Sequence, residues 1–93
     1  MIPKTIHYVW FGGNEKPKSV LNAIETWRTN LPDYEIREWN ELNYEVTENT
    51  PNYVDQAFKE KSWAFVSDYV RLDVLNQFGG IYLDTDVELL KGF

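Results

Sequence analysis

The sequence predicts an α/β protein with a largely parallel sheet. Three short segments with strand patterns, at residues 4–11, 34–39 and 80–86, are separated by segments in which apolar residues recur at helical spacing. Strands that alternate with helices in this order form βαβ units, whose strands run parallel. The 93 residues allow a single domain, and 43% of them are hydrophobic, which is enough for a folded core.

The first half of the chain has a β-α-β pattern. Residues 4–11, KTIHYVWF, are rich in β-branched and aromatic side chains and end at two glycines, which is typical of a strand that enters a loop. In residues 19–30, SVLNAIETWRTN, apolar side chains recur at helical spacing, and Pro17 suits the turn that opens a helix. Residues 34–39, YEIREW, alternate as a half-buried strand does.

The second half of the chain predicts two helices and a strand. Residues 40–52 are polar and unpatterned, and we expect a loop whose Thr-Pro pair caps a short helix ending at Lys59. A longer helix is predicted over residues 62–78, ended by Gly79. The strand GIYLDTD, residues 80–86, comes next, and the following VELL extends it or begins another.

The composition excludes several classes of protein. A formal net charge of -6 argues against a nucleic-acid-binding protein, because binding to phosphates needs clustered Lys and Arg. Without cysteine, neither a disulfide framework nor a thiolate zinc site can form. No segment has the length and hydrophobicity of a membrane span or a signal peptide, so we expect a cytoplasmic location, in solution or at the cytoplasmic face of the membrane.

Three carboxylates, Asp84, Asp86 and Glu88, stand at every second position near the end of the chain. If the strand continues through them, their side chains share one face and repel one another unless water, basic groups or a metal ion compensates. A hard divalent cation is the obvious candidate, although Glu88 is better explained as a solvated edge residue than as a third ligand. An EF-hand is excluded, because Leu89 occupies the loop position that requires glycine.

Ligands of open α/β sheets bind beyond the carboxyl ends of the strands. Two segments fall there in the predicted fold, namely VWFGG at residues 9–13 and LDTD at residues 83–86. The glycines form neither a GxGxxG fingerprint nor a P-loop, which argues against a dehydrogenase or an NTPase. A glycoside hydrolase is also disfavoured, because its two carboxylates must flank a bond and two neighbours on one strand serve that poorly.

The long helix carries a charged pair, Asp68 and Arg71, on one face. On spacing alone such a pair is most often a surface salt bridge. The helix leads through two glycines into the acidic segment, however, and this proximity favours a functional role for the pair. His7, the one histidine, lies in an apolar strand and is expected to be a hydrogen-bonded core residue rather than a ligand.

Two segments together resemble a known family. IPKTIHYVWFGG and FVSDYVRLDVLNQFGGIYLDTDVE resemble glycosyltransferases with a DXD-containing sugar-binding region, glycosyltransferase family 32, whose bacterial members include capsular polysaccharide transferases. The chain is more distantly similar to the glucosyltransferase domains of large clostridial toxins. A DXD motif alone is common, but Ser-Asp, two residues, Arg and then GGIYLDTD is a specific combination.

The resemblance implies a Rossmann-like nucleotide-diphosphate-sugar transferase fold of the GT-A type, with a mainly parallel sheet in its donor-binding part. It implies that the aspartates of the DXD motif bind Mn²⁺ or Mg²⁺ between the two phosphates of the donor, with Asp86 as a ligand of the metal and Asp84 in contact with the ribose or, through water, with the metal. Asp68 and Arg71 match residues beside the donor sugar and phosphates. Trp10 matches an aromatic residue that stacks on the nucleotide base, whereas a strand tryptophan is otherwise most often core.

The activity that the resemblance implies is transfer of a hexose from a nucleotide-diphosphate sugar, a UDP-sugar or GDP-mannose, to a saccharide acceptor with retention. Because this fold normally needs more chain after the DXD strand, we expect residues 1–93 to be a single donor-binding domain, the N-terminal part of a longer glycosyltransferase. A noncatalytic module that binds nucleotide-sugar and metal is the alternative. An exposed sheet edge further predicts weak self-association.

Overall fold

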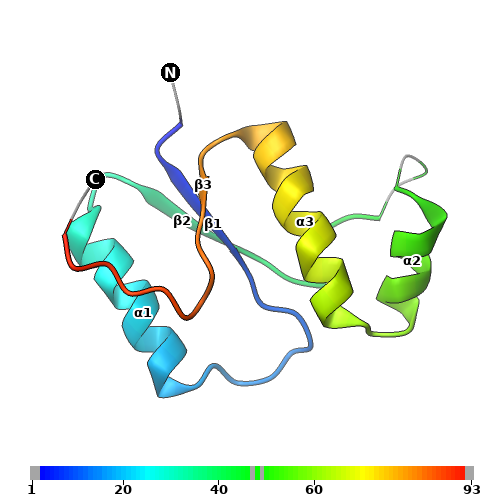
Figure 1. Cartoon of the computed structure of the whole chain (residues 1–93), viewed down its shortest axis with the longest axis horizontal. Coiled ribbons are helices and arrows are strands. Elements are labelled where there is room, and N and C mark those ends of the chain that lie inside the picture. Colours follow the sequence, from blue (N-terminus) through cyan, green and yellow to red (C-terminus); the bar gives the residue numbers. More distant parts are fainter. Residues whose placement is uncertain (1–2, 47, 49, 92–93) are drawn as a thin grey trace.

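The structure of the chain, a computed structural model, describes residues 3–46, 48 and 50–91. The elements are β1 (Thr5–Val9), α1 (Lys18–Asn30), β2 (Glu35–Trp39), α2 (Asn52–Lys59), α3 (Trp63–Phe78) and β3 (Ile81–Tyr82) (Figure 1). The strands form one parallel sheet in the order β2-β1-β3. The prediction of an α/β protein with a parallel sheet is confirmed.

Helices cover both faces of the sheet, with α1 on one face and α3 on the other, and α2 lies beside α3 (Figure 1). The alternation of side chains along β1 explains this arrangement. Ile6 and Tyr8 pack against the α1 side, whereas Val9 packs against the α3 side. The central strand is therefore buried on both faces, as expected of a parallel sheet.

Helix α1 buries one apolar stripe against the sheet. Its residues Ile24 and Trp27 lie in a cluster with Ile6 and Tyr8, and the Trp27 side chain is fully buried. The Trp27 ring meets the Tyr8 ring edge-on at a centroid distance of 5.7 Å. The helix begins after Pro17, whose carbonyl accepts the first intrahelical hydrogen bonds, as the sequence predicted.

Helix α3 buries Val66, Val70 and Val74 against the opposite face of the sheet. These valines are four residues apart, so they form one stripe along the helix. Gly79 ends the helix with a φ of 68° and donates its backbone N–H to the carbonyl of Leu75 at 2.9 Å. Both this helix and its glycine stop agree with the sequence prediction.

His7 is a core residue, as expected. Its Nδ1 accepts a hydrogen bond from the indole N–H of Trp39 at 3.0 Å, and its Nε2 lies 2.9 Å from the carbonyl oxygen of Gly79. This pair of contacts requires the neutral tautomer with the proton on Nε2, because Nδ1 accepts and a carbonyl cannot donate. Burial lowers the pKa of the imidazole, which favours the same neutral form.

Two predicted strands are shorter in the structure. The first ends at Val9 rather than at residue 11, and the third ends at Tyr82 rather than at residue 86. The N–H of Leu83 makes the last bond to β1, at the carbonyl of His7, and a turn then closes between Asp84 and Val87. The prediction of a strand through the carboxylates is wrong, and VELL neither extends nor begins a strand.

The bounds of the remaining predicted elements agree with the structure, but the expected cap of α2 does not, because the N-cap residue is Pro51 and no side-chain hydrogen bond caps the helix. Helices α1, α2 and α3 and strand β2 each begin and end within one residue of the expected bounds or at them. The expected loop over residues 40–52 contains a turn at residues 41–43, and its Thr47 and Asn49 lie outside the described residues. Within the described part of the chain, no helix has the length and hydrophobicity needed to cross a membrane.

Candidate functional site

A cleft of about 490 Å³ opens at the carboxyl ends of β1 and β3. Its walls come from the residues that follow β1, from one face of α3 and from the turn after β3. The lining residues are Val9, Trp10, Phe11, Trp63, Ala64, Ser67, Asp68, Arg71, Tyr82, Asp84, Thr85 and Asp86. The structure thus places every candidate binding residue from the sequence on one cleft, and neither His7 nor Glu88 lines it.

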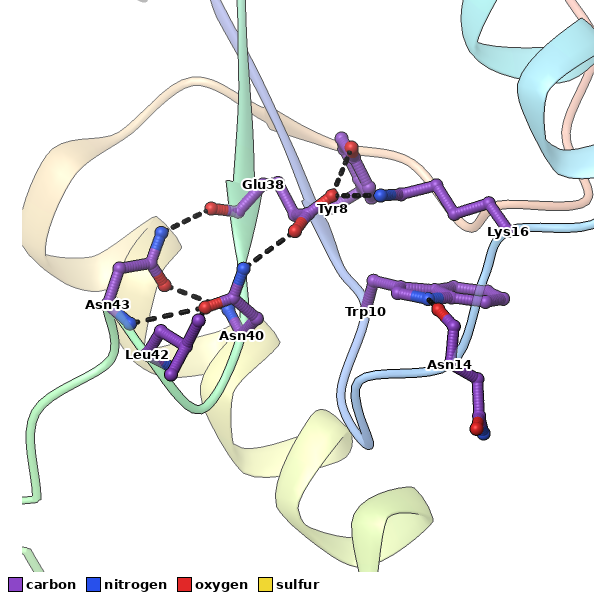
Figure 2. A network of polar contacts seen from close by, with 8 residues as sticks. All are labelled: Tyr8, Trp10, Asn14, Lys16, Glu38, Asn40, Leu42 and Asn43. Carbon is purple, nitrogen blue, oxygen red and sulfur yellow. Dashed lines mark hydrogen bonds and ion pairs between the residues drawn. The ribbon is translucent and has the colours of Figure 1, made fainter.

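Trp10 forms one wall of the cleft directly after β1. Its backbone N–H donates to the carbonyl of Trp39 at 2.9 Å, and its half-buried ring packs against the cluster on the α1 side of the sheet. The indole N–H donates to the carbonyl of Asn14 at 2.7 Å (Figure 2). The ring is therefore partly core and partly cleft wall, with a fixed orientation.

The α3 wall presents a charged pair. A guanidinium nitrogen of Arg71 lies 3.0 Å from a carboxylate oxygen of Asp68, as the helical spacing predicted. The Arg71 guanidinium also lies over the Tyr82 ring, 5.0 Å from its centroid, in a cation–π contact. Burial, with a smaller contribution from the Asp84 carboxylate, raises the pKa of Tyr82 to about 12, so its hydroxyl stays protonated at neutral pH.

The turn after β3 brings two carboxylates to the cleft. Asp84 and Asp86 both line it, although they lie in a turn and not along a strand. The turn is closed by a hydrogen bond of 3.0 Å from the N–H of Val87 to the carbonyl of Asp84. Both carboxylates are exposed, which relieves the mutual repulsion that an extended strand would impose. Glu88 is exposed and is not among the residues that line the cleft.

Side chains of α1 hold the backbone that follows this turn. The indole N–H of Trp27 donates to the carbonyl of Val87 at 2.7 Å. The N–H of Leu89 donates to the Thr26 hydroxyl at 2.9 Å, and the Asn30 amide donates to the carbonyl of Leu89 at 3.0 Å. Figure 1 shows this segment running beside α1. These three bonds replace the ladder of a longer strand, which explains why β3 stops where it does.

The donor atoms at the cleft suit a cation that is shared with a ligand. Among the described residues, no three His, Cys, Asp or Glu are arranged to hold a metal ion. Asp84 and Asp86 take part in none of the ion pairs of the described chain. Mg²⁺ is commonly bound by one or two carboxylates, with phosphate oxygens and water completing the coordination. The residues present fit such an ion, and its binding stays a prediction.

Sequence reasoning missed several lining residues on α3, including Trp63 and Ser67. The Phe11 and Trp63 rings stack at a centroid distance of 5.4 Å and an angle of 10° and form the aromatic end of the cleft. Residues three and four apart share a helix face, so the spacing of Asp68 and Arg71 could have predicted that Ser67 and the preceding turn of α3 also face the cleft. No sequence pattern announces the contact of Phe11 with Trp63, which are far apart in the chain.

The comparisons with known proteins agree with this geometry. Residues 17–93 match the family described as glycosyltransferase sugar-binding region containing DXD motif. The match covers most of the chain and includes the α3 wall and the acidic turn. The chain therefore belongs to this glycosyltransferase family.

Several curated proteins are similar to the chain. Inositol phosphoceramide mannosyltransferase 3 of Schizosaccharomyces pombe is 33% identical over 92% of the chain and 24% of its own length. An uncharacterized glycosyltransferase of Acanthamoeba polyphaga mimivirus is 31% identical over 98% of the chain and 38% of its own length. Subversion of eukaryotic traffic protein A of Legionella pneumophila is 24% identical over 92% of the chain and 17% of its own length. The chain thus spans well under half of each relative.

A solved structure shows the same fold. The PaToxG glycosyltransferase superposes with a TM-score of 0.78 and 25% sequence identity, over 99% of this chain and 45% of that one. The α/β arrangement with its parallel sheet is therefore the arrangement of part of a glycosyltransferase.

Proposed function

We propose that the cleft binds a nucleotide-diphosphate sugar and that residues 1–93 are the donor-binding part of a longer, metal-dependent glycosyltransferase. We infer transfer of a hexose to a saccharide acceptor with retention, a Rossmann-like fold of the GT-A type and membership in glycosyltransferase family 32. Family membership and the related glycosyltransferases support glycosyl transfer in general. The finer statements rest on the cleft and on the resemblance of its motifs. We also propose that the enzyme works in the cytoplasm.

The charge of the cleft is the observation that carries the proposal. Three carboxylates, those of Asp68, Asp84 and Asp86, and one guanidinium, that of Arg71, line it. The cleft is therefore anionic, as is the diphosphate of a nucleotide-sugar, and the two repel unless a cation lies between them. A divalent ion held by oxygen ligands resolves this conflict and makes donor binding depend on metal.

The lining residues suit the parts of such a donor. Trp10 offers an aromatic face to the nucleotide base. Asp86 would be a ligand of the Mn²⁺ or Mg²⁺, and Asp84 would contact the ribose or, through water, the metal. Asp68 accepts hydrogen bonds from sugar hydroxyls, while Arg71 supplies a fixed positive charge that its contacts with Asp68 and Tyr82 keep in place.

Transfer breaks the bond between the anomeric carbon and a phosphate oxygen, and the nucleoside diphosphate leaves. The acceptor hydroxyl forms the new bond to that carbon and loses its proton. The metal ion, when bound, neutralises charge that develops on the leaving diphosphate. Arg71 contributes to the same stabilisation from the protein side, because its guanidinium is always charged and is already oriented before the donor binds.

Calorimetric titration tests the proposal with UDP-glucose, UDP-galactose and GDP-mannose, each with and without Mn²⁺. GDP-mannose belongs in the panel because one relative is named a mannosyltransferase. We expect one donor to bind only in the presence of Mn²⁺ and to lose this binding in Asp86→Ala. Glu88→Ala is the matched control, since it removes an exposed carboxylate outside the cleft.

Binding that is equal in Asp86→Ala and wild type would contradict the assignment of the metal residues. Turnover of the bound donor to free nucleoside diphosphate, absent in Asp86→Ala, would support an enzyme. Metal-dependent binding without turnover would support the alternative, a noncatalytic nucleotide-sugar module, for residues 1–93.

A further inference from the structure

Glu38, near the carboxyl end of β2, is the centre of a polar network beside the cleft. One oxygen of its carboxylate accepts a hydrogen bond from the Tyr8 hydroxyl at 2.8 Å and lies 2.6 Å from the ammonium group of Lys16. The other oxygen accepts from the Asn40 amide at 2.6 Å, and the Asn43 amide donates to the backbone carbonyl of Glu38 at 2.7 Å. Figure 2 shows this network joining β1, β2 and both loops that follow them.

The loop that carries Trp10 is fastened at several points. The indole N–H of Trp10 donates to the carbonyl of Asn14 inside the loop, as described above. The N–H of Gly12 donates to a carboxylate oxygen of Glu41 at 2.6 Å. Lys16, at the far end of the loop, makes the ion pair with Glu38. Trp10 therefore lies on a short loop that Glu41 binds in the middle, at Gly12, and Glu38 binds at the far end, at Lys16.

The ion pair of Lys16 and Glu38 differs from the other ion pairs of the described chain in its burial. The two side chains are 24% and 27% exposed, whereas those of the Arg28–Glu25 pair on α1 are 61% and 64% exposed. Burial alone would raise the pKa of the Glu38 carboxyl, but the hydrogen bonds from Lys16, Asn40 and Tyr8 outweigh burial and lower it. The carboxylate thus stays charged and keeps a fixed geometry.

We propose that Glu38 and Lys16 are positioning residues. They fix the loop of residues 10–16 and thereby keep the Trp10 ring in one orientation at the wall of the cleft. Neither residue lines the cleft, so both would affect a bound ligand only through the position of Trp10. The inference that the ring receives the base of a nucleotide-sugar rests on the proposed function. The fixing of the ring itself does not, because every contact that supports it lies within this chain.

The first experiment needs no ligand. Hydrogen exchange of the Trp10 indole N–H is followed by NMR in the full chain, with the signal assigned by its loss in Trp10→Phe. Lys16→Met removes the charge and keeps the length of the side chain, and we expect exchange about tenfold faster, since a bond to a charged group is lost. Arg28→Met, the control that breaks an exposed ion pair, leaves the rate unchanged, and Lys16→Arg restores it.

An unchanged Trp10 exchange rate in Lys16→Met would overturn the proposal. So would equal acceleration of all the tryptophan indole protons together with a lower Tm, because that result means general loosening of the fold.

The second experiment measures donor affinity with Mn²⁺ present. We expect Lys16→Met to weaken binding about tenfold and to have no further effect in a Trp10→Phe background, because both changes remove one contact. Additive losses would contradict action through Trp10. If no donor binds the wild-type chain, the proposed function fails, and the exchange experiment still decides whether the ion pair fixes the ring.

Discussion

A single imidazole joins three segments of this protein. His7 on β1 is completely buried, accepts a hydrogen bond from Trp39 on β2 and contacts the carbonyl of Gly79 between α3 and β3. The next residue, Gly80, passes so close to β1 that a Cβ atom there would lie 2.6 Å from the carbonyl oxygen of Thr5. The close approach of the backbone and the buried hydrogen bonds together fix where β3 meets the sheet.

This arrangement predicts a loss of stability in mild acid. The pKa of His7 is lowered in the folded state by burial, from 6.5, so the folded protein binds fewer protons than the unfolded chain below that value. The stability that the neutral ring provides is complete above pH 6.5 and is lost as the pH falls toward the folded pKa. Urea midpoints at about pH 7.5 and about pH 5.5 measure the loss.

His7→Gln separates this effect from that of the carboxylates. The glutamine side chain of this variant does not titrate, so any loss of stability that it causes is the same at both pH values. The decrease between the two pH values should therefore be smaller in His7→Gln than in wild type. Equal decreases in both proteins would show that His7 does not cause the acid sensitivity.

At the scale of elements, α1 both covers the sheet and holds the segment that follows the acidic turn. Thr26→Val removes the hydroxyl that accepts the N–H of Leu89 and keeps the shape of the side chain. We expect faster amide exchange at Leu89 and a loss of stability of about 1 kcal/mol, as for a typical hydrogen bond. Exchange measured by NMR checks the prediction residue by residue.

Thr29→Val is the matched control for this prediction. It makes the same change on the same helix at an exposed position, where it should leave the Leu89 amide protected. Equal exchange rates in the two variants would mean that the bond from Leu89 to Thr26 contributes nothing to holding the turn.

The sequence predicts most elements because their signals are local. The long helix α3, its stop at Gly79 and the strand β2 each depend on nearby residues, and the structure confirms these elements. The length of β3 depends on distant partners instead. Its strand pattern continues to residue 86, but side chains of α1 form hydrogen bonds with the backbone of Val87 and Leu89. These bonds compete with strand pairing, and no sequence pattern predicts them.

The candidate site also combines residues that local motifs predict with contacts that depend on distant partners. Asp68, Arg71, Asp84 and Asp86 carry motif signals, and the structure brings them to one cleft. The expected common strand face for the carboxylates is replaced by a turn, because side chains of α1 bind the backbone that follows it. The contacts of Glu38 join side chains that are distant in the sequence, such as those of Tyr8 and Lys16, and only the folded chain shows them.

At the scale of the whole molecule, the sheet has two edges. In the described residues β2 and β3 each have a neighbour on one side, and β3 presents unpaired backbone groups on its outer side. We predict weak self-association through an exposed edge. Sedimentation velocity over a range of concentrations should show a rising average mass, and a monomer at every concentration would contradict the prediction.

Salt should strengthen this association. The formal net charge of -6 makes two copies repel, and added salt screens that repulsion. An increase of the average mass with ionic strength is therefore expected, whereas dissociation by salt would point to pairing through opposite charges instead of a sheet edge.

The central position of β1 governs the order in which the molecule can be assembled during synthesis. The hydrogen bonds of His7 can form only after Trp39, 32 residues later, and Gly79, 72 residues later, have been synthesised. At a translation rate of about 5–20 residues per second, the second wait lasts about 4–14 seconds. Strands that pair over such distances also fold slowly. Of the three strands in this sheet, β1 is thus made first and completed last, and its apolar residues spend those seconds without their partners.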